Sequence, residues 1–350
     1  MAQKILVVGN LGYVGSVLTN YLQKNSKKKR EIFGFDNGLF KNCFFGPKKI
    51  SKNIKFQYVG DVRKFDYQIL EDIDNVIYLA AISNDPMGNK FINPTQEINF
   101  RSAVNLAKNC KKFSVKTFTF ASSCSMYGYK NDLKNEKSKL FPLTPYAKSK
   151  IFAEQKLKKL STKKFKIFSL RFGTACGVSS RFRLDLVLND FVTNAIINKK
   201  IEILSRGDSW RPLIDVKDMC RAIDWSVTKE FKQNFVAVNV GHLNCNYQIR
   251  DLAYAIKRKM PNINIFINSN NPPDKRSYKV DFTLFNKLGR GFLPQMKLED
   301  SINEMISFIK KSKFKNKNFR NSNFIRLNFL KKQLDKKKID RNLFLKKQPF

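Results

Sequence analysis

The chain has 350 residues, of which 42% are hydrophobic, and its formal net charge is +39. This length suits one large domain or two closely packed ones, and the apolar content is enough for a sizeable core. No apolar run approaches the roughly 18 residues needed to cross a bilayer, and the opening KILVVG lacks the features of a secretory signal. We therefore expect a cytoplasmic protein without a membrane span.

The positive charge and the cysteine pattern bear on two further classes of protein, namely nucleic-acid binders and proteins held together by metal ions or disulfides. Lysine is accompanied by abundant Asn, Ile and Phe, the residues of AT-rich codons, so a biased genome explains the charge. No recognition motif for DNA or RNA is present, so we expect no nucleic-acid partner, although a basic surface can attract an anionic small substrate. Six scattered cysteines without a C-x-x-C pair, together with the single His242, argue against a metal site or a disulfide framework.

Short apolar runs alternate with longer amphipathic stretches through the first half of the chain. The predicted strands are 4–9, 31–36, 55–61, 75–81, 117–123 and 166–173, and the predicted helices are 14–24, 64–71, 95–112 and 146–160. This alternation predicts an α/β fold, namely a Rossmann-type doubly wound parallel sheet with helices on both faces. A late strand-like run, 235–241, is expected to return to the same sheet.

A glycine-rich turn follows the first predicted strand. Gly9, Gly12 and Gly15 open the first predicted helix, where glycine permits the bend and the close approach of a pyrophosphate. Asp36 ends the second predicted strand, 21 residues after Gly15. A carboxylate at that point accepts hydrogen bonds from ribose hydroxyls and repels a 2′-phosphate, so the pattern predicts NAD rather than NADP.

Further cofactor contacts are expected where the other strands end. Asp61 and Val62 are expected to face the adenine, and Ala80 and Ala81 to let the backbone approach the cofactor. With their neighbours, the cofactor-binding residues expected from these turns are Gly9, Gly12, Tyr13, Val14, Gly15, Asp36, Asp61, Val62, Leu79, Ala80 and Ala81.

The sequence suggests a division of the chain into two domains and a C-terminal tail. Residues 1–180, completed by the strand near 235–241, are expected to form the NAD-binding Rossmann domain, and 181–311 a smaller, interleaved C-terminal lobe that mainly binds substrate. Residues 312–350 are basic and poor in turns, so we interpret them as an appended tail that is partly disordered or helical. A short amphipathic helix is expected within the tail near 324–334.

A tyrosine and a lysine form a possible catalytic pair. Tyr146 and Lys150 spell Y-x-x-x-K at the start of a predicted helix, and this spacing places both on one helical face. A nearby ammonium favours the phenolate and is expected to lower the pKa of the tyrosine. The pattern alone is a common accident in a lysine-rich chain. However, the strand at 117–123 ends in hydroxyl residues that can hydrogen-bond a reacting oxygen beside the cofactor.

The glycine turn, SSCSMYG (122–128) and YAKSK (146–150), in this order and spacing, resemble the extended short-chain dehydrogenase/reductase family. Within that family they are similar to the nucleotide-sugar epimerases and dehydratases, of which UDP-glucose 4-epimerase is the best known. The resemblance covers residues 3 to about 308. It implies an NAD-dependent enzyme acting on a nucleotide-diphosphate sugar, as in cell-surface polysaccharide biosynthesis. It also implies a homodimer formed through the helices at 96–112 and 147–160.

The resemblance also implies roles for individual residues. Ser123 corresponds to the catalytic Ser/Thr, Tyr146 to the acid/base, and Lys150 to the residue that orients the nicotinamide ribose. Tyr146, Lys150 and Asn99, which matches an asparagine beside the active site, join the cofactor-binding set. The implied substrate-binding residues are Ser123, Asn84, Thr174, Asn189, Arg211, Arg276 and Tyr278.

Three of these residues have specific implied roles in binding the nucleotide sugar. Arg211 matches an arginine that clamps the pyrophosphate, a role suited to a forked guanidinium. Asn189 matches a residue at the phosphate region of the substrate, and Tyr278 a position that limits the room around C2 of the sugar. For Asn189 and Tyr278, ordinary core packing is the alternative.

Departures from the family pattern limit the reactions that we expect the protein to catalyse. Cys124 and Ser125 stand where 4,6-dehydratases carry the Asp-Glu pair that eliminates water, so we do not expect dehydration. Cys124 is either a packed small residue or an acid/base. Thr174 replaces a usual substrate-contacting Asn, and Arg276 is a possible substitute for an arginine missing at Asn271. Stretch 80–89 and the pair Arg181 and Arg183 also differ from UDP-glucose 4-epimerase and are expected to shape a different glycosyl pocket.

Three hypotheses about function follow. The first is an epimerase that oxidises and re-reduces C4 of an NDP-hexose, with Tyr146 taking the proton of the C4 hydroxyl while hydride moves to NAD⁺. The second, a 4-dehydrogenase or 4-ketoreductase, uses the same residues but does not return the hydride to the same sugar. The third is a non-catalytic NAD- or RNA-binding protein, and the intact set Ser123, Tyr146 and Lys150 argues against it.

Overall fold

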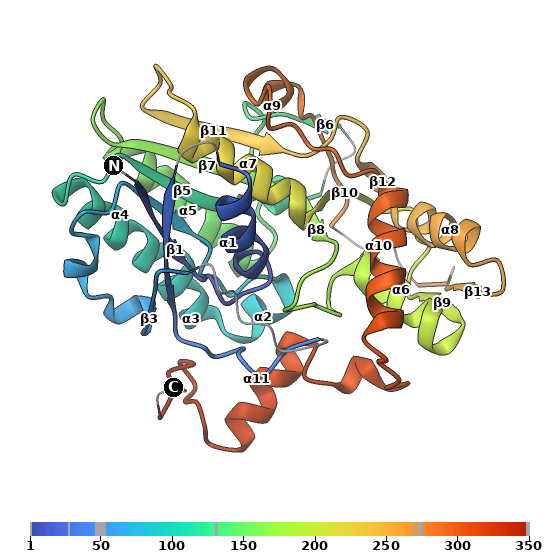
Figure 1. The fold of residues 1–350 in the computed structure, drawn as a ribbon. Helices are drawn as coiled ribbons and strands as arrows, with labels where there is room; N and C mark the ends of the chain where they lie inside the picture. The colour runs from blue at the N-terminus through green and yellow to red at the C-terminus, as the bar shows by residue number, and fades with distance from the viewer. Residues whose placement is uncertain are drawn as a thin grey trace.

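Parallel strands form the central sheet of this computed structural model, which describes residues 2–26, 29–45, 54–129, 132–268, 270–271 and 276–347. The sheet has seven strands in the order β11-β7-β5-β4-β1-β2-β3 (Figure 1). These strands are β1 (Gln3–Val8), β2 (Arg30–Asp36), β3 (Phe56–Val59), β4 (Asn75–Tyr78), β5 (Thr117–Ser123), β7 (Lys166–Phe172) and β11 (Phe235–Val240). The predicted Rossmann-type fold is confirmed, and the late strand β11 joins this sheet beside β7.

Helices cover both faces of the sheet because the strands are apolar on both sides. Ile5 and Val7 of β1 pack with α1 (Gly15–Lys24) and α7 (Val216–Thr228) on one face. Leu6 and Val8 of the same strand pack with α4 (Ala103–Lys112) and α5 (Pro145–Leu160) on the other. Successive side chains of a strand point to opposite faces, so a continuous apolar run serves both layers.

Two predicted helices differ from expectation. Segment 64–71 is not an α-helix but two short 3-10 turns, Val62–Lys64 and Tyr67–Leu70. The Asp61 and Asp66 side chains accept hydrogen bonds from the backbone two residues further on, so each starts a new turn. Segment 95–112 divides into α3 (Ile92–Gln96), a π-helix (Glu97–Ser102) and α4.

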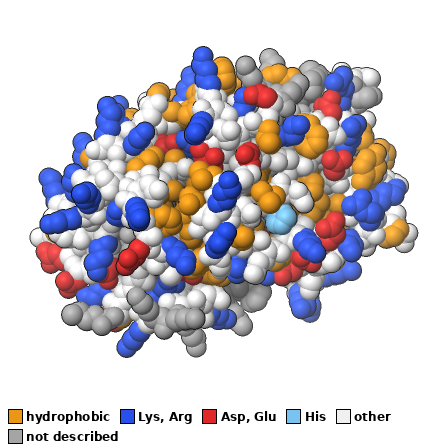
Figure 2. Space-filling view, turned by 90° about the horizontal axis from the view of Figure 1, so that it is seen from above, with side chains coloured by type: hydrophobic (Ala, Val, Ile, Leu, Met, Phe, Trp, Pro, Cys, Tyr) orange, Lys and Arg blue, Asp and Glu red, His pale blue; other side chains and the backbone are white. Residues whose placement is uncertain are grey.

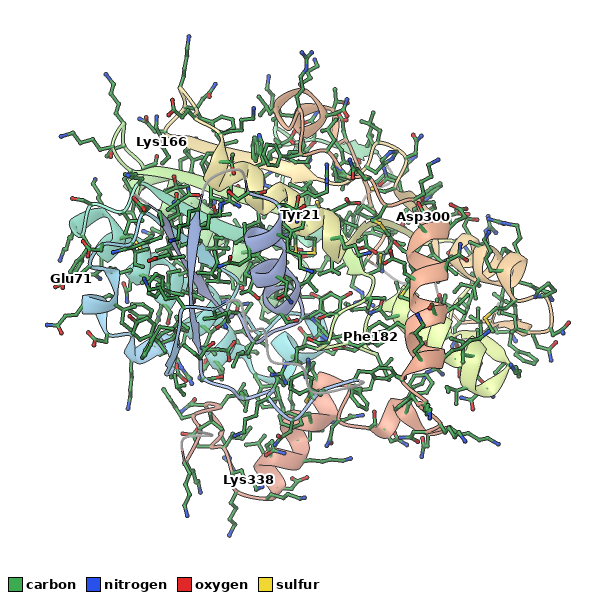
Figure 3. The ribbon with its side chains drawn as sticks, in the orientation of Figure 1. Tyr21, Glu71, Lys166, Phe182, Asp300 and Lys338 are labelled. Atoms are coloured by element: carbon green, nitrogen blue, oxygen red, sulfur yellow. The ribbon has the colours of Figure 1, made fainter. Side chains whose placement is uncertain are left out.

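A second lobe is built around its own apolar core, to which Leu188, Ile201 and Leu252 belong. Its main helices are α6 (Val187–Asn198), α8 (Ile249–Lys259) and α10 (Leu298–Lys311). Phe182, labelled in Figure 3, places its ring 5.1 Å from that of Phe45 and 5.5 Å from that of Phe308, between α10 and the Rossmann domain. The remaining strands and helices are β6 (Leu133–Lys134), β8 (Thr174–Cys176), β9 (Lys200–Ile203), β10 (Trp210–Asp215), β12 (Asn246–Gln248), β13 (Asn264–Ile267), β14 (Lys279–Val280), α2 (Asp85–Lys90) and α9 (Thr283–Leu288).

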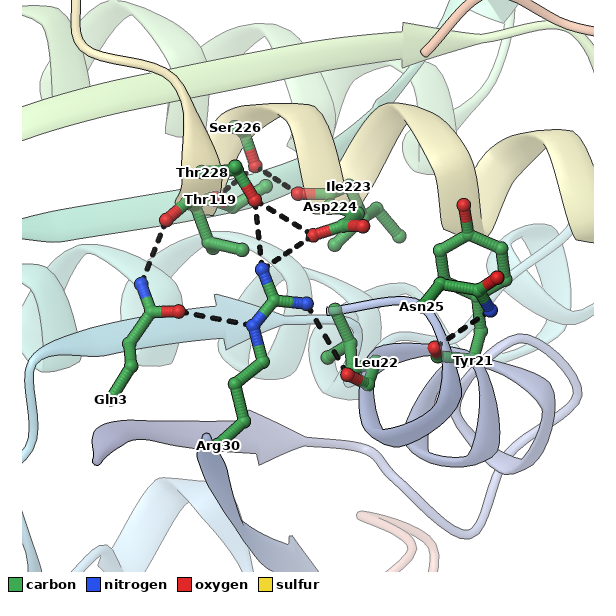
Figure 4. Close-up of polar contacts among 11 residues, drawn as sticks. Gln3, Tyr21, Leu22, Asn25, Arg30, Thr119, Ile223, Asp224, Ser226 and Thr228 are labelled. Atoms are coloured by element: carbon green, nitrogen blue, oxygen red, sulfur yellow. Dashed lines mark hydrogen bonds and ion pairs between the residues drawn. The ribbon is translucent and has the colours of Figure 1, made fainter. Parts of the chain in front are cut away.

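A buried ion pair ties α7 to the first strands (Figure 4). Arg30, at the start of β2, donates from Nη2 to Asp224 at 2.7 Å and to Thr228 at 2.8 Å. Its Nε donates to the Gln3 side chain at 3.1 Å, and its Nη1 to the carbonyl of Leu22 in α1 at 3.3 Å. The Arg30 and Asp224 side chains are each 3% exposed, so removing either would leave a buried charge unpaired.

Residues 312–347, hereafter the C-terminal segment, pack against the domain, where the sequence predicted a tail that is partly disordered or helical. The segment contains α11 (Arg326–Asp335) and a 3-10 turn (Phe319–Asn321), and it runs below α2 in Figure 1. Its buried side chains share a cluster with residues that follow β2 and β4: Leu39, Cys43, Ile82, Met87, Phe91, Phe329, Leu330, Ile339 and Leu343. The segment therefore covers loops at the carboxyl end of the central sheet.

No helix among the described residues is long and apolar enough to span a bilayer. All six cysteines are buried and free. Within the same described residues, His, Cys, Asp and Glu side chains nowhere gather in a group of three that could hold a metal ion.

Candidate active site

A cavity of about 820 Å³ lies at the carboxyl ends of the central strands and continues towards the second lobe. Its walls include Gly9 after β1, Asp36 at the end of β2, Ala80 after β4 and Ser123 at the end of β5. The strand order reverses between β1 and β4, and open α/β sheets bind their ligands at this switch point. The cavity has the size of a cofactor or substrate site.

The glycine turn forms one wall. Gly9 has a φ of 93°, and a Cβ there would lie 2.7 Å from the backbone nitrogen of Ala80. A Cβ on Gly15, the first residue of α1, would collide with the Gly9 carbonyl oxygen. No side chain fits at Gly9 or Gly15, because the turn packs directly on its own backbone and on that of the loop after β4. A bare backbone turn at a helix N-terminus fits a pyrophosphate group.

Asp36 lies beside this turn and also faces the cavity. Its Oδ2 accepts a hydrogen bond from the backbone of Leu11 at 3.1 Å, and its Oδ1 one from Gly38 at 2.8 Å. Burial raises the pKa of the Asp36 carboxyl, while these two bonds oppose that change. The expected cofactor residues Tyr13, Val14, Gly12, Asp61, Val62, Leu79 and Ala81 line the same cavity.

Ser123 and Tyr146 face the cavity from neighbouring elements. Pro145 and the N-cap Thr144, whose hydroxyl accepts a bond from the Ala147 backbone at 3.2 Å, start α5 directly before Tyr146. Burial raises the pKa of Tyr146 to about 12, and a hydrogen bond with Ser123 lowers it in part. The expected net lowering of this pKa is therefore wrong for the protein without ligands, because the loss of hydration outweighs the attraction of nearby charge.

Lys150 lies one helical turn after Tyr146 and is 2% exposed. Its Nζ donates to the carbonyl of Ala121 at 2.7 Å. The same atom lies 4.7 Å from the centre of the Phe120 ring and 5.7 Å from that of Tyr146. Burial lowers the pKa of Lys150 to about 7. Ser123, Tyr146 and Lys150 are thus brought together on one wall of the cavity.

Asn99 does not line the cavity but lies behind it, fully buried within the π-helix. Its side chain holds the backbone of Ile82, accepting from the nitrogen at 2.8 Å and donating to the oxygen at 3.0 Å. It also donates to Ser149 Oγ at 3.1 Å, and Ser149 donates to the carbonyl of Tyr146 at 2.7 Å. Asn99 is therefore placed to position the loop after β4 and the start of α5.

The implied substrate residues lie further along the cavity, with one exception. Asn84, Thr174, Arg211, Arg276 and Tyr278 line it. The Arg211 guanidinium lies 6.0 Å from the ring centre of Tyr278, and Arg276 forms an ion pair of 3.2 Å with Asp85.

Asn189 is the exception, because its side chain is fully buried and lies outside the cavity lining. Its Oδ1 accepts from the Gly177 backbone at 3.2 Å, and its Nδ2 donates to the Arg183 carbonyl at 3.1 Å. The structure thus places it in a supporting layer, which is the core-packing alternative considered from the sequence.

A charged network forms the wall between the two lobes. Arg183 donates to both oxygens of Asp185 at 2.9 Å and to the Ser83 hydroxyl at 2.9 Å. Asp185 also accepts a bond from the Asn84 side chain at 2.7 Å. The network joins the loop after β4 to the segment before α6, the two stretches in which the sequence departs from UDP-glucose 4-epimerase. Arg183 lines the cavity, whereas Arg181 does not.

Cys124 is not a cavity residue. It is fully buried, and its Sγ donates to the carbonyl of Arg171 at 3.1 Å. Burial raises the pKa of this thiol well above its ordinary value. An acid/base role for Cys124 is therefore wrong, and the neighbouring Ser125, which accepts a bond from Ser123 at 2.9 Å, is the residue that reaches the cavity.

Several cavity residues were missed by the sequence analysis. Asp185, Asp190, Glu202, Arg320 and Arg326 all contribute to the walls. Asp185 lies two residues after Arg183 in the sequence, and the departure of Arg183 from the family pattern already indicated that this stretch shapes the pocket. Arg320 and Arg326 belong to the C-terminal segment, and no local pattern links that segment to the cofactor motifs.

A Rossmann-type sheet that directs a glycine turn, a carboxylate at the end of β2 and a Ser, Tyr and Lys set into one cavity is typical of a dinucleotide-dependent enzyme. The chain belongs to the NAD dependent epimerase/dehydratase family, whose model matches residues 5–241. The carboxylate of Asp36 and the bare turn at Gly9 and Gly15 fit the NAD that gives this family its name.

Known relatives agree with this family. The chain is 30% identical over 236 residues to the uncharacterized UDP-glucose epimerase YtcB of Bacillus subtilis (strain 168), an alignment covering 63% of this chain and 71% of that protein. It is 30% identical over 185 residues to the UDP-glucose 4-epimerase of Lactobacillus helveticus, covering 51% of this chain and 53% of the relative.

Solved structures share the fold. The UDP-glucuronic acid 4-epimerase of Bacillus cereus, solved with UDP-glucuronic acid and NAD, has a TM-score of 0.73 at 25% identity, covering 88% of this chain and 99% of that one. MoeE5, solved with the same two ligands, has a TM-score of 0.76 at 20% identity and the same coverage.

Proposed function

We propose that this protein is a nucleotide-sugar epimerase that oxidises and then re-reduces C4 of an NDP-hexose. The observation that carries the proposal is the convergence of Ser123, Tyr146 and Lys150 on the cavity that also holds the glycine turn and Asp36. NAD, when bound, accepts the hydride of C4 and returns it. All other steps fall to side chains of the protein.

Tyr146 is the acid/base in this proposal. As phenolate it takes the proton of the C4 hydroxyl, and as phenol it returns a proton after the sugar has presented its other face. The hydrogen bond between Ser123 and Tyr146 lowers the pKa of Tyr146 and so favours the phenolate. With substrate bound, the Ser123 hydroxyl, which otherwise donates to Ser125, turns to the C4 oxygen. Lys150, held by the Ala121 carbonyl, faces the cavity one turn further along α5 and orients the cofactor ribose.

The far end of the cavity would bind the nucleotide diphosphate. Arg211 offers a guanidinium beside the Tyr278 ring, a geometry suited to a diphosphate next to a sugar. The ion pair of Asp85 and Arg276 borders the same space and can exchange its partners for sugar hydroxyls. A dehydratase is disfavoured, because Cys124 is buried and Ser125 supplies only a hydroxyl.

We also infer a homodimer, which the family resemblance implies, although α5 offers it few exposed apolar side chains. Ile151 and Leu157 are buried in the core of this chain, whereas Phe152 is 44% exposed. Phe152 lies beside Phe100 at a ring distance of 5.8 Å and is therefore the residue of α5 available for such a contact.

The high positive charge does not favour an RNA-binding function over this one. In Figure 2, lysine and arginine side chains are spread over the visible face among acidic and apolar groups. A nucleic-acid site gathers such charge into a patch or stripe along the backbone of its ligand.

The test is purified protein incubated with NAD and a panel of NDP-hexoses. A C4-inverted product without accumulation of NADH supports the epimerase. NADH formed in proportion to product overturns it in favour of a 4-dehydrogenase, and a product formed only with added NADH favours a 4-ketoreductase. Salt-sensitive RNA binding without turnover of any sugar would favour the non-catalytic alternative.

A further inference from the structure

Arg326 is a buried cation with an unused donor. It is 3% exposed and lines the cavity from the first residue of α11. Its Nη2 donates to the carbonyl of Arg181 at 3.4 Å, and its guanidinium lies 4.6 Å from the ring centre of Phe40. The guanidinium also interacts with the thiol of Cys43. Its Nη1 has no hydrogen-bond partner among the described residues. Burying such an N–H unpaired is costly, which points to a ligand that satisfies it.

The charges around Arg326 favour an anionic ligand. Arg181 and Arg183 lie close enough for charge interactions with it, so three guanidinium groups share this region. Of the nearby carboxylates, Asp185 is held by Arg183 through two bonds of 2.9 Å, and Asp36 accepts two backbone N–H groups. Repulsion from the charge of Arg326 adds to burial in lowering the pKa of Arg181 to about 10.

The position of Arg326 indicates that its ligand is the cofactor rather than the sugar nucleotide. The Phe40 ring under its guanidinium belongs to the loop after β2, and this loop lines the cavity together with Asp36 and Asn37. Asp36 marks the ribose of the ADP half of a dinucleotide. Arg211, the residue suited to the diphosphate of the substrate, comes from β10 in the second lobe.

We propose that Arg326 donates a hydrogen bond to the ADP half of the dinucleotide, on the side of the ribose that Asp36 marks, so that the C-terminal segment completes the cofactor site. A guanidinium with a free N–H suits the oxygens of this half of the cofactor, and such charge-assisted bonds are among the strong ones in proteins. This inference rests on the NAD site and is independent of the reaction proposed at C4 of the sugar.

Other contacts hold the C-terminal segment in place without Arg326. Arg63 donates to the carbonyl of Asn342 at 2.6 Å and stacks 3.4 Å from the ring centre of Phe344. Arg320 pairs with Asp190 at 2.8 Å. Replacing Arg326 should therefore leave the segment docked, and a loss of affinity would report on the missing guanidinium.

The experiment compares Arg326→Met, which is similar in volume, with Lys331→Met on the exposed side of α11. Isothermal titration calorimetry with NAD, ADP and UDP is run on each purified protein, together with thermal unfolding without ligand. For Arg326→Met we expect a loss of about 10- to 100-fold in affinity for NAD and ADP, from one charged hydrogen bond. The affinity for UDP should not fall, because UDP is expected to bind elsewhere in the cavity. The melting temperature without ligand should not fall either, because the guanidinium of Arg326 is only partly hydrogen-bonded in the free protein.

Each result decides the proposal. Unchanged affinity for NAD and ADP overturns it, and so does a loss confined to UDP, which would assign Arg326 to the sugar nucleotide. A lower melting temperature without ligand, together with full affinity at a temperature where the variant is folded, would assign Arg326 a structural role. Arg326→Lys keeps the charge without the fork, and we expect an affinity between those of the wild type and Arg326→Met. Lys331→Met should match the wild type throughout.

Discussion

Lys150 donates a hydrogen bond of 2.7 Å to the carbonyl of Ala121, near the end of the strand that carries Ser123. This bond anchors the ammonium of α5 to β5 and so fixes the helix that carries Tyr146 against the strand that carries Ser123. The ammonium is nevertheless almost fully buried, and burial lowers the pKa of Lys150 to about 7.

The lowered pKa predicts how stability depends on pH. In the unfolded chain a lysine keeps its proton up to about pH 10.4, so between pH 7 and 10 the unfolded state binds more protons than the folded one. The free energy of unfolding of the ligand-free protein should therefore rise with pH across this window, relative to Lys150→Met. Urea unfolding of both proteins at pH 7 and pH 9.5 measures the difference, which should change by a few kcal/mol. A pH-independent difference would contradict the buried ammonium.

Tyr146→Phe removes the proposed acid/base and little else. We expect kcat to fall by about 1000-fold or more, the scale of general acid–base catalysis, because the C4 proton loses its acceptor. Binding of NAD, measured by calorimetry, should be unchanged. Comparable turnover in the variant would end the assignment of Tyr146.

Ser123→Ala tests the hydroxyl beside that tyrosine. The hydrogen bond with Ser123 lowers the pKa of Tyr146, so its loss should raise this pKa above about 12. The rate should fall by about 100-fold because less phenolate is present, and this loss should be the same at every pH well below 12, where the phenolate fraction of both proteins rises in parallel with pH. Ser125→Ala is the control, since Ser125 accepts a bond from Ser123 without being assigned a step. An unchanged rate would show that Ser123 does not act on Tyr146.

Asp36 should determine which dinucleotide is bound. Its carboxylate faces the cavity beside the charges of Arg181 and Arg326, so Asp36→Ser removes the repulsion of a 2′-phosphate and leaves the guanidinium groups. We expect NADH to bind about 10-fold more weakly and NADPH more tightly than to the wild type. Fluorescence titration with both reduced cofactors gives the ratio of affinities. An unchanged ratio would mean that Asp36 does not contact the ribose.

The buried pair of Arg30 and Asp224 predicts a stability effect far from the cavity. Arg30→Met leaves Asp224 buried and unpaired, which should cost about 3 to 5 kcal/mol of unfolding free energy. The double variant Arg30→Met with Asp224→Leu should recover most of that loss, because no charge remains buried. Urea unfolding of both variants measures it, and an additive second loss would contradict this account.

Much of the fold could be predicted because buried parallel strands carry their signal locally. The apolar runs fell on the strands of the central sheet to within three residues at each end, and the glycine turn and Asp36 reached the cavity as expected. The helix predicted over 64–71 failed because Asp66 restarts the backbone hydrogen bonding within the stretch. The π-helix at 97–102 leaves no comparable mark in the sequence.

The site was less predictable where it depends on packing between distant segments. Asn99 and Asn189 have the right place in the sequence, yet both point into the protein and support the wall from behind. Arg326 has no motif around it, and only the docking of α11 brings it to the cavity. The spacing of a motif indicates which residues are neighbours within one strand–turn–helix segment. The contacts of Asn99, Asn189 and Arg326 depend instead on how separate segments pack against each other.

The packing of the C-terminal segment has a consequence for biosynthesis. Gly9 and Asp36 leave the ribosome well before Arg320 and Arg326, which line the same cavity. The Rossmann strands can pair before the cavity is complete. If Arg326 binds the cofactor as proposed, the full dinucleotide affinity has to wait until α11 docks. A ligand stabilises only the state that binds it, so free NAD would favour the docking of α11 over the undocked state. The supply of NAD would therefore influence how much of the newly made protein escapes proteolysis.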